Sequence, residues 1–168
     1  MNARPAPKFA MRPMLPVDVP LLVEIFRAAI EELTADDYSE AQQEAWAAAA
    51  DDEADFGARL AGELTLVATY DGAAVGFASL ADNTRIDMLY VHPAASGQGA
   101  GAMLCDALEK LAAARGSKEL TVDASDSARG FFEKRGFLGQ SRNTLSLGGE
   151  WLANTTMKKP LAAKGGQP

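Results

Sequence analysis

Three glycines at alternate positions form the part of this sequence with the clearest chemistry. Gly97, Gly99 and Gly101 follow the apolar segment 88–91 and begin a segment, 99–115, in which apolar residues recur at helical spacing. Glycines leave backbone N–H groups uncovered, and a helix that begins here adds the partial positive charge of its N-terminus. Backbone amides in such a turn bind phosphate oxygens. The turn therefore predicts a site for a phosphate-bearing ligand.

The same turn satisfies the G-x-G-x-x-A pattern of dinucleotide-binding folds over residues 97–102, and Asp123 follows where a ribose-binding acid is expected. The residues around the turn do not fit a dinucleotide site well. Residues 93–96 separate the strand from the first glycine, whereas a dinucleotide site has the strand leading directly into it. Too little chain follows Asp123 to complete such a fold. Dinucleotide binding is therefore kept as a less favoured alternative.

Hydrophobic periodicity and turn signals predict a mixed fold of the α/β (α+β) class around these glycines. Asp18, Ser39 and Ser125 are expected helix N-caps, and Ser39 with Gln42 forms a capping box. Asp71 followed by Gly72 predicts a hairpin. The expected strands are 9–15, 64–70, 74–80, 85–91, 119–124, 138–147 and 152–158, and the expected helices are 18–33, a segment around Trp46, 51–60, 99–115 and 125–136.

Length and composition restrict the classes of function. The 168 residues suit one domain, which we expect over 1–160 with a loose tail over 161–168. A net charge of −7 disfavours a nucleic-acid partner. No apolar run is long enough for a membrane span, and no segment reads as a signal peptide. Cys105 is the single cysteine, which excludes an internal disulfide, favours a cytoplasmic protein and suggests no metal site.

Two sequence blocks together resemble the GNAT N-acetyltransferase superfamily, closest to its YafP-like branch. The first block is an apolar strand, Val91-His92-Pro93, a short spacer and the glycine turn with its helix. The second is the strand 120–125, continued by the aromatic segment 131–137 that ends in Gly-Phe. The resemblance implies a mixed, mostly antiparallel central sheet of about seven strands flanked by helices. It also implies that the phosphate-bearing ligand is acetyl-CoA, used as a co-substrate without a metal.

The resemblance assigns cofactor contacts position by position. The pantetheine arm would lie along Met88, Leu89, Tyr90 and Val91, and the pyrophosphate would bind Ser96, Gly97, Gln98, Gly99, Ala100, Gly101 and Ala102. Ser125, Ala128, Phe131, Phe132 and Arg135 would flank the other side of the cofactor. Ser96 departs from the Gln or Arg that usually opens the family motif. Phosphate binding is expected to survive this change because backbone amides do most of it.

A second departure concerns the general acid. Many family members carry a tyrosine where this chain has Phe132, and that hydroxyl protonates the departing thiolate. Tyr90 is the first candidate replacement, Tyr38 the second, and water the third. Asp87, a carboxylate on an otherwise apolar strand, is the candidate general base that would deprotonate an ammonium substrate. The alternative for Asp87 is a structural acid with hydrogen-bonded neighbours.

The predicted function is therefore an acetyl-CoA-dependent N-acetyltransferase that moves an acetyl group to a primary amine by direct attack in a ternary complex. Tyr38, Trp46 and Trp151 are expected to contact the acceptor, a small-molecule or peptide amine that no motif identifies. The sequence does not distinguish a monomer from a homodimer. A non-catalytic acyl-CoA-binding module, consistent with Phe132, is the alternative from another class.

Overall fold

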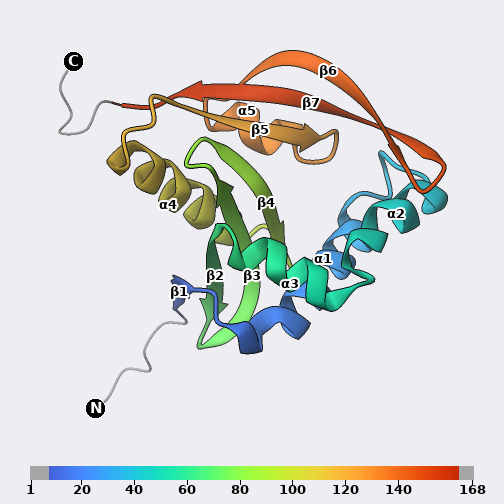
Figure 1. The fold of residues 1–168 in the computed structure, drawn as a ribbon, viewed down its shortest axis with the longest axis horizontal. Coiled ribbons are helices and arrows are strands. Elements are labelled where there is room, and N and C mark those ends of the chain that lie inside the picture. Colours follow the sequence, from blue (N-terminus) through green and yellow to red (C-terminus); the bar gives the residue numbers. More distant parts are fainter. Residues whose placement is uncertain (1–7, 163–168) are drawn as a thin grey trace.

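The computed structural model describes residues 8–162, which form a seven-stranded sheet with helices on both faces (Figure 1). The strand order is β1-β2-β3-β4-β5-β7-β6, and every neighbouring pair is antiparallel except β4 with β5. The strands are β1 (Phe9–Pro13), β2 (Leu64–Tyr70), β3 (Ala73–Ala81), β4 (Arg85–Val91), β5 (Glu119–Ser125), β6 (Leu138–Leu147) and β7 (Glu150–Pro160). The helices are α1 (Val19–Leu33), α2 (Glu40–Ala47), α3 (Glu53–Ala61), α4 (Ala100–Ala114) and α5 (Arg129–Lys134). Among the described helices, none has the length and apolar character needed to cross a membrane.

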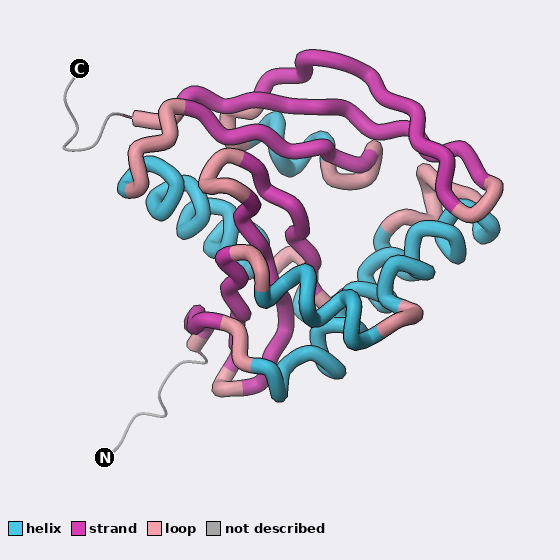
Figure 2. Tube along the Cα trace, in the orientation of Figure 1, coloured by secondary structure: helices cyan, strands magenta, loops and turns pink. Residues whose placement is uncertain are grey.

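The sheet divides into two arms where β4 meets β5. These strands pair only at Arg85 with Thr121 and at Ile86 with Val122. Asp87 is an extra residue on β4, because the register with β3 shifts just there; such a β-bulge bends its strand and increases the local twist. Beyond the bulge, residues 88–91 pair with β3 on one side, and no strand within residues 8–162 pairs with them on the other. Figure 2 shows the resulting arms, β1–β4 and β5–β7, diverging from this point.

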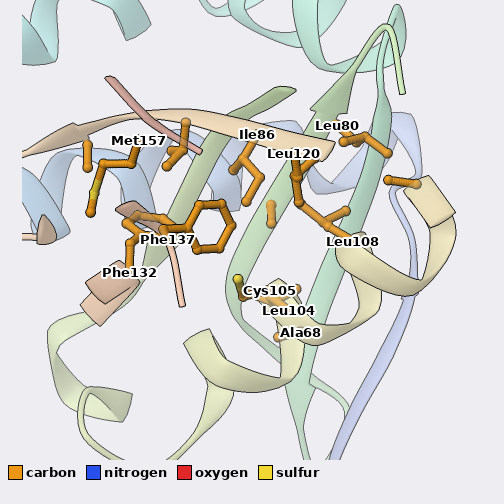
Figure 3. Close-up of a cluster of buried hydrophobic side chains, with 14 of the residues drawn as sticks. Ala68, Leu80, Ile86, Leu104, Cys105, Leu108, Leu120, Phe132, Phe137 and Met157 are labelled. Carbon is orange, nitrogen blue, oxygen red and sulfur yellow. The ribbon is translucent and has the colours of Figure 1, made fainter. Parts of the chain in front are cut away.

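Two hydrophobic clusters occupy opposite faces of the sheet. The alternation of side chains along β3 explains this, since Phe77 enters one cluster and Ala78 the other. The first cluster lies under α4 and α5 and includes Leu104, Leu120, Phe132 and Met157 (Figure 3). The second lies under α1 and α3 and is built around Leu22, Phe26, Phe56 and Met88. The first cluster contains residues of both arms, whereas the strand residues of the second come from β2–β4 alone.

Two helix starts differ from expectation. Ser125 is the last residue of β5, and α5 begins only at Arg129, because the Ser125 hydroxyl accepts a hydrogen bond from the Ala128 amide (3.1 Å) and closes a turn before the helix. Asp18 precedes α1 as expected, but its carboxylate does not cap that helix. It instead accepts hydrogen bonds from the Arg12 guanidinium and the Leu15 amide (2.7 Å). By contrast, Ser39 caps α2 through the predicted capping box.

Leu161, the first residue of the expected tail, is held against the fold. Leu161 packs against the cluster under α4, and its amide donates to the Lys118 carbonyl (2.8 Å). Residues 163–168 lie outside the described residues.

Candidate active site

A cavity of about 270 Å³ opens where β4 and β5 diverge. Its walls come from these two strands, from α1 and α2, and from the β6–β7 hairpin, on which α2 rests. Among the predicted site residues, its lining includes Tyr38, Trp46, Asp87, Met88, Leu89, Tyr90, Val91, Ser125, Ala128 and Phe132. The divergence of the strands therefore brings together residues from four separate parts of the chain.

The free edge of β4 forms one wall of this cavity. Residues 88–91 present backbone groups that no strand pairs on the β5 side. An unpaired backbone edge inside a fold needs a hydrogen-bonding partner. A narrow, amide-bearing ligand lying between β4 and β5 would supply such partners in the way an inserted strand does.

The glycine turn continues this edge into α4. Gly97 and Gly99 adopt left-handed backbone conformations, with φ of 77° and 98°, and a Cβ atom at either residue would meet no atom within 4 Å. The backbone conformation, rather than crowding, therefore requires glycine there, and the space beside the amides is open. Gly99 occupies the N-cap position of α4 without a side-chain cap. The first N–H groups of α4 are thus available to an anion.

Gly101 has a different role from the other two glycines. A Cβ atom at Gly101 would lie 3.3 Å from the Phe131 ring, so the small residue allows α4 and the α5 region to pack closely. The Arg135 guanidinium lies 4.4 Å from the centroid of the same ring. Arg135 also borders a second recess together with Ala102 and Lys159. The predicted cofactor residues Phe131 and Arg135 are therefore placed beside the glycine turn rather than in the main cavity.

Asp87 is held by two arginines. Its carboxylate is only 4 % exposed and accepts hydrogen bonds from Arg59 Nε, Arg59 Nη2 and Arg85 Nη1, each at 2.8 Å. Burial by itself raises the pKa of this carboxyl, but the hydrogen bonds from Arg59 and Arg85 outweigh burial and lower the pKa to about 2. A carboxylate with so low a pKa is a weak proton acceptor at neutral pH. This environment favours the structural alternative for Asp87 over the general base.

Glu63 belongs to the same polar cluster as Asp87, although the sequence did not predict it as a site residue. Burial raises its pKa first, and the neighbouring Asp87 raises it further. The groups that shift its pKa include Ser79 of β3 and Asp87 of β4, which are 16 and 24 positions away in the sequence, so only the folded structure reveals the cluster.

Tyr90 and Trp46 both line the cavity and are joined by a hydrogen bond. The Trp46 indole N–H donates to the Tyr90 hydroxyl (3.2 Å), and the Tyr90 ring packs edge-on against Phe26 with centroids 4.8 Å apart. Burial raises the pKa of Tyr90 to about 12, so the phenol keeps its proton at neutral pH. Because an indole N–H is only a donor, the proton of Tyr90 stays free for donation to another group.

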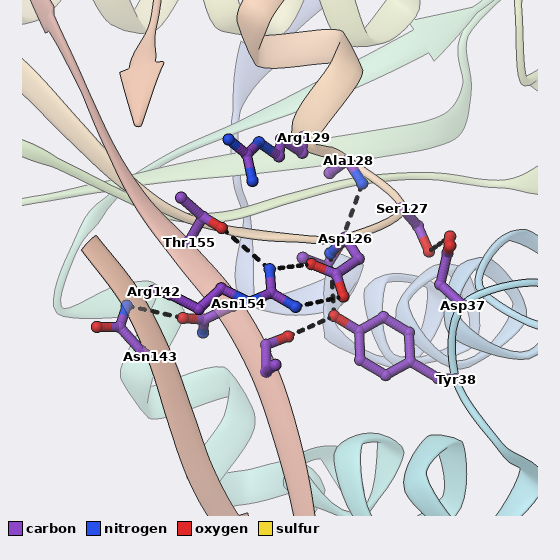
Figure 4. A network of polar contacts seen from close by, with 12 residues as sticks. Asp37, Tyr38, Asp126, Ser127, Ala128, Arg129, Arg142, Asn143, Asn154 and Thr155 are labelled. Carbon is purple, nitrogen blue, oxygen red and sulfur yellow. Dashed lines mark hydrogen bonds and ion pairs between the residues drawn. The ribbon is translucent and has the colours of Figure 1, made fainter. Parts of the chain in front are cut away.

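The Tyr38 hydroxyl already acts as both a hydrogen-bond donor and a hydrogen-bond acceptor. It donates to the Ala153 carbonyl (2.7 Å) and accepts from the Asp126 amide (3.0 Å), as Figure 4 shows. The residue is 6 % exposed. Its proton is therefore committed to a backbone carbonyl, which contradicts the interpretation of Tyr38 as a replacement acid. Tyr38 connects the α1–α2 segment to β7 and to the β5–α5 turn.

Trp151 does not meet the expectation of an acceptor contact. It is 65 % exposed and is absent from the cavity lining, while its carbonyl accepts a hydrogen bond from Gln42 Nε2 (2.7 Å). The alternation of β7 explains the difference, since the neighbouring Leu152 is the residue that reaches the cavity. Asp123 and Asn154 also line the cavity, and the sequence reasoning had not placed them in the acetyl-CoA site.

Comparison with known proteins agrees with this geometry. A family model described as "Acetyltransferase (GNAT) domain" matches residues 34–161. The chain belongs to the GNAT acetyltransferase family. A curated relative from Escherichia coli (strain K12), named "Uncharacterized N-acetyltransferase YafP", is 34% identical over 143 residues, which cover 85% of this chain and 90% of that protein.

Solved structures show the same GNAT fold. The crystal structure of a GCN5-related N-acetyltransferase from Rhodopseudomonas palustris is 61% identical, with a TM-score of 0.90 and coverage of 96% of this chain and 99% of that one. The PaiA N-acetyltransferase from Thermoplasma acidophilum, crystallised in complex with coenzyme A, is 21% identical, with a TM-score of 0.75 and coverage of 91% and 99%. The expected GNAT fold, family and acetyltransferase class are therefore confirmed.

Proposed function

We propose that this GNAT protein transfers the acetyl group of acetyl-CoA to a primary amine by direct attack in a ternary complex. The observation that carries the proposal is the free edge of β4, residues 88–91, which continues into the open, amide-lined turn at Gly97 and Gly99. The pantetheine arm of acetyl-CoA carries amides that would pair with the free edge of β4. The pyrophosphate at the end of that arm would then lie at the glycine turn. The coenzyme A complex of PaiA supports this assignment at the level of the fold.

Apart from orienting the two substrates, the protein needs to supply few chemical groups for this reaction. The amine nitrogen, after losing the proton of its ammonium form to solvent or a carboxylate, attacks the thioester carbonyl carbon. The carbon–sulfur bond breaks, the CoA thiolate departs, and the new amide nitrogen releases its second proton. Backbone N–H groups of 88–91 would stabilise the oxyanion that develops on the carbonyl oxygen. Holding both substrates between β4 and β5 supplies the main rate enhancement.

Tyr90 is the group we assign to the leaving thiolate. Phe132 lines the cavity but has no acidic proton, and the hydroxyl of Tyr38 already donates to the Ala153 carbonyl. The pKa of Tyr90, about 12, lies well above the value of ~8.5 for a thiol. Full proton transfer from Tyr90 is therefore uphill, and a hydrogen bond to the sulfur is the contribution the geometry supports. Solvent then protonates the thiolate after release.

A non-catalytic acyl-CoA-binding module remains the second candidate, favoured by the phenylalanine at position 132. Two measurements separate the candidates. Thermal unfolding with acetyl-CoA, CoA or NAD tests binding, because a ligand at a hundredfold excess over its Kd stabilises by about 2.7 kcal/mol. Release of the CoA thiol with a panel of amines tests turnover. We expect a rise of Tm with acetyl-CoA, none with NAD, and thiol release with at least one amine.

The opposite results have defined meanings. Stabilisation by acetyl-CoA without thiol release from any amine favours the binding module. Stabilisation by NAD alone contradicts the assignment of the glycine turn to CoA.

A further inference from the structure

Three exposed leucines converge on the cavity from two elements. Leu33 belongs to the end of α1, and Leu145 and Leu147 belong to β6. All three line the cavity together with Leu152 of β7, which is buried. A single exposed leucine needs no explanation, but several that gather around one hollow indicate a surface that binds an apolar group.

The register of the β6–β7 hairpin places three of these leucines on one face. Leu145 pairs with Leu152, and Leu147 follows two residues after Leu145 on the same strand. Their side chains therefore point to the same side of the hairpin, which we call the leucine face. Ser146 and its partner Trp151 point to the opposite side. The alternation thus directs the leucines, and not Trp151, into the cavity.

The tip of the hairpin touches α2 beside Trp46. A Cβ atom at Gly148 would lie 3.4 Å from the Ala45 Cβ atom, so the turn and the helix are in close contact. Figure 1 shows the end of the β6–β7 hairpin next to α2. Leu147 is the residue before Gly148, and Trp46 is the residue after Ala45. The leucine face and the Trp46 indole therefore line the same part of the cavity.

This part of the cavity is level with Tyr90, the group assigned to the leaving thiolate. On β4, Tyr90 lies four residues beyond Ile86, the last residue that pairs with β5. The same count along β5 leads just past its end at Ser125. Leu152 also lies past that end, two residues beyond the partner of Ser125 on β7. The Trp46 indole, which donates to the Tyr90 hydroxyl (3.2 Å), connects the two sides.

The cavity offers no positively charged side chain to an acidic acceptor. Among the described residues that line it, none is a lysine or an arginine. The hydroxyls of Thr34 and Tyr38, which also line it, already donate to backbone carbonyls. A carboxylate at the far end of an acceptor would therefore lie among leucines without a charged partner, which is unfavourable.

From these contacts we infer that the acceptor amine carries an apolar group that packs between the leucine face and Trp46, and that Leu145 and Leu147 determine this specificity. The inference rests on the proposed function and names the class of its acceptor. The amino group would lie towards Tyr90, and the apolar group would extend towards the tip of the hairpin. Binding then strengthens with each methylene that the leucines cover.

The first experiment compares three straight-chain amines with the full-length protein and saturating acetyl-CoA, by the rate of thiol release. Propylamine and hexylamine have amino groups of nearly equal basicity and differ by three methylenes. In 6-aminohexanoate a carboxylate replaces the terminal methyl of hexylamine. Each buried methylene is worth about fourfold in binding. We therefore expect kcat/KM for hexylamine to exceed the values for propylamine and for 6-aminohexanoate by about tenfold or more.

The opposite result with these probes is well defined. Turnover of propylamine or 6-aminohexanoate that equals or exceeds that of hexylamine would overturn the inference, as would thiol release only with amines outside this series. In both cases the N-acetyltransferase function would still stand.

The second experiment tests the leucine face directly. Leu145→Asn replaces an apolar side chain that is 42 % exposed by a polar one of similar size, so the fold is kept. We expect kcat/KM for hexylamine to fall about fivefold or more, with propylamine and KM for acetyl-CoA unchanged. Leu147→Asn should act in the same direction, and Leu145→Met should keep the preference for hexylamine. Leu138→Asn is the control, because it makes the same change at an exposed position of β6 outside the cavity lining.

The outcomes separate the inference from the proposed function. An equal loss for both alkylamines with a lowered Tm would indicate a structural role and contradict the inference. A loss of preference in Leu138→Asn as large as in Leu145→Asn would contradict it as well. If acetyl-CoA neither raises Tm nor releases thiol with any amine, the proposed function fails and the inference fails with it.

Discussion

Single residues in this GNAT protein divide into those that hold the backbone and those that line the cavity. Gly99 holds a left-handed conformation beside open space, Asp87 anchors two arginines, and Tyr90 retains a proton at the cavity wall. The side-chain type alone does not separate these roles. Asp87 and Asp123 are the same residue at equivalent positions, and only their partners distinguish an anchor from a free charge.

The glycine turn gives a first prediction at this scale. Gly99→Ala places a side chain at φ of 98°, which costs roughly 1–2 kcal/mol in an L-residue and displaces the amides at the start of α4. We expect Kd for CoA to rise about tenfold or more, measured by calorimetry. Gly72→Ala is the matched control, since Gly72 has φ of 87° and equally open surroundings in the β2–β3 hairpin. A similar loss of CoA affinity in both variants would contradict a specific role for the turn.

Tyr90 gives a second prediction. Tyr90→Phe keeps the ring packed against Phe26 and removes the hydroxyl that would contact the thiolate. Because a hydrogen-bond donor to the developing thiolate is lost, we expect kcat to fall by about 10²-fold with KM for acetyl-CoA unchanged, as judged from initial rates of thiol release. If kcat stays at the level of the unmodified protein, solvent alone supports the leaving group.

Asp87 gives a third prediction, which concerns stability and pH. Its folded pKa of about 2 lies below the value of ~3.9 for an unfolded aspartate, so its contribution is present above pH ~4 and is lost as the pH falls towards 2. We expect Asp87→Asn to lower the free energy of unfolding at pH 7 by about 1–3 kcal/mol, with this difference shrinking below pH 4. Urea titrations across this range provide the measurement.

The same variant tests the general base. If Asp87 only anchors Arg59 and Arg85, the pH profile of kcat/KM in Asp87→Asn keeps its shape between pH 6 and 9, as measured for the folded variant. A profile that loses its acidic limb would restore Asp87 as the proton acceptor.

At the scale of elements, hydrogen bonds connect the helical segments that wall the cavity to both arms of the sheet. Tyr38, at the end of the α1–α2 segment, joins the β7 carbonyl of Ala153 to the β5–α5 turn, and Arg142 of β6 pairs with Asp126 in that turn (Figure 4). Trp46 of α2 reaches Tyr90 on β4. The helices at the N-terminal end of the chain are therefore held against both arms of the sheet, which gives the cavity a fixed outline.

Removing the Tyr38 hydroxyl tests this connection. Tyr38→Phe leaves a buried carbonyl and an amide without their partner, and we expect a loss of about 1–3 kcal/mol in the free energy of unfolding. Hydrogen exchange at the Asp126 amide should accelerate in parallel. Tyr70→Phe is the control, because within residues 8–162 the Tyr70 hydroxyl forms no hydrogen bond in the structure. An equal loss in both variants would contradict a connecting role for Tyr38.

For the whole molecule, the divergence of the two arms is the central feature. The β4–β5 pairing ends after two residues, while the hydrophobic cluster under α4 and α5 contains residues of both arms and joins them on one face. A ligand that hydrogen-bonds to both open edges would complete the sheet. This makes the site the place where binding and stability are most directly coupled.

Hydrogen exchange with and without acetyl-CoA tests this coupling. We expect slower exchange of the amides in 88–91 and 97–102 when the ligand is bound, with smaller changes in β1 and β6, which lie at the sheet edges. Uniform slowing over all strands would indicate a general rise in stability rather than contacts along the open edge.

Local patterns determined much of this protein from sequence alone. The bounds of β2, β4 and β6, the capping box at Ser39 and the glycine turn follow from periodicity and conformational preference, which act over a few residues. Only the tertiary structure decided what faces the cavity. The bulge at Asp87 depends on the pairing of β4 with β3, the burial of Leu152 rather than Trp151 depends on which face of β7 the fold covers, and Tyr38 finds its partners 88 and 115 positions away. The contacts of Asp87 with Arg59 and of Asp123 with Thr156 likewise join residues about thirty positions apart, which no local pattern encodes.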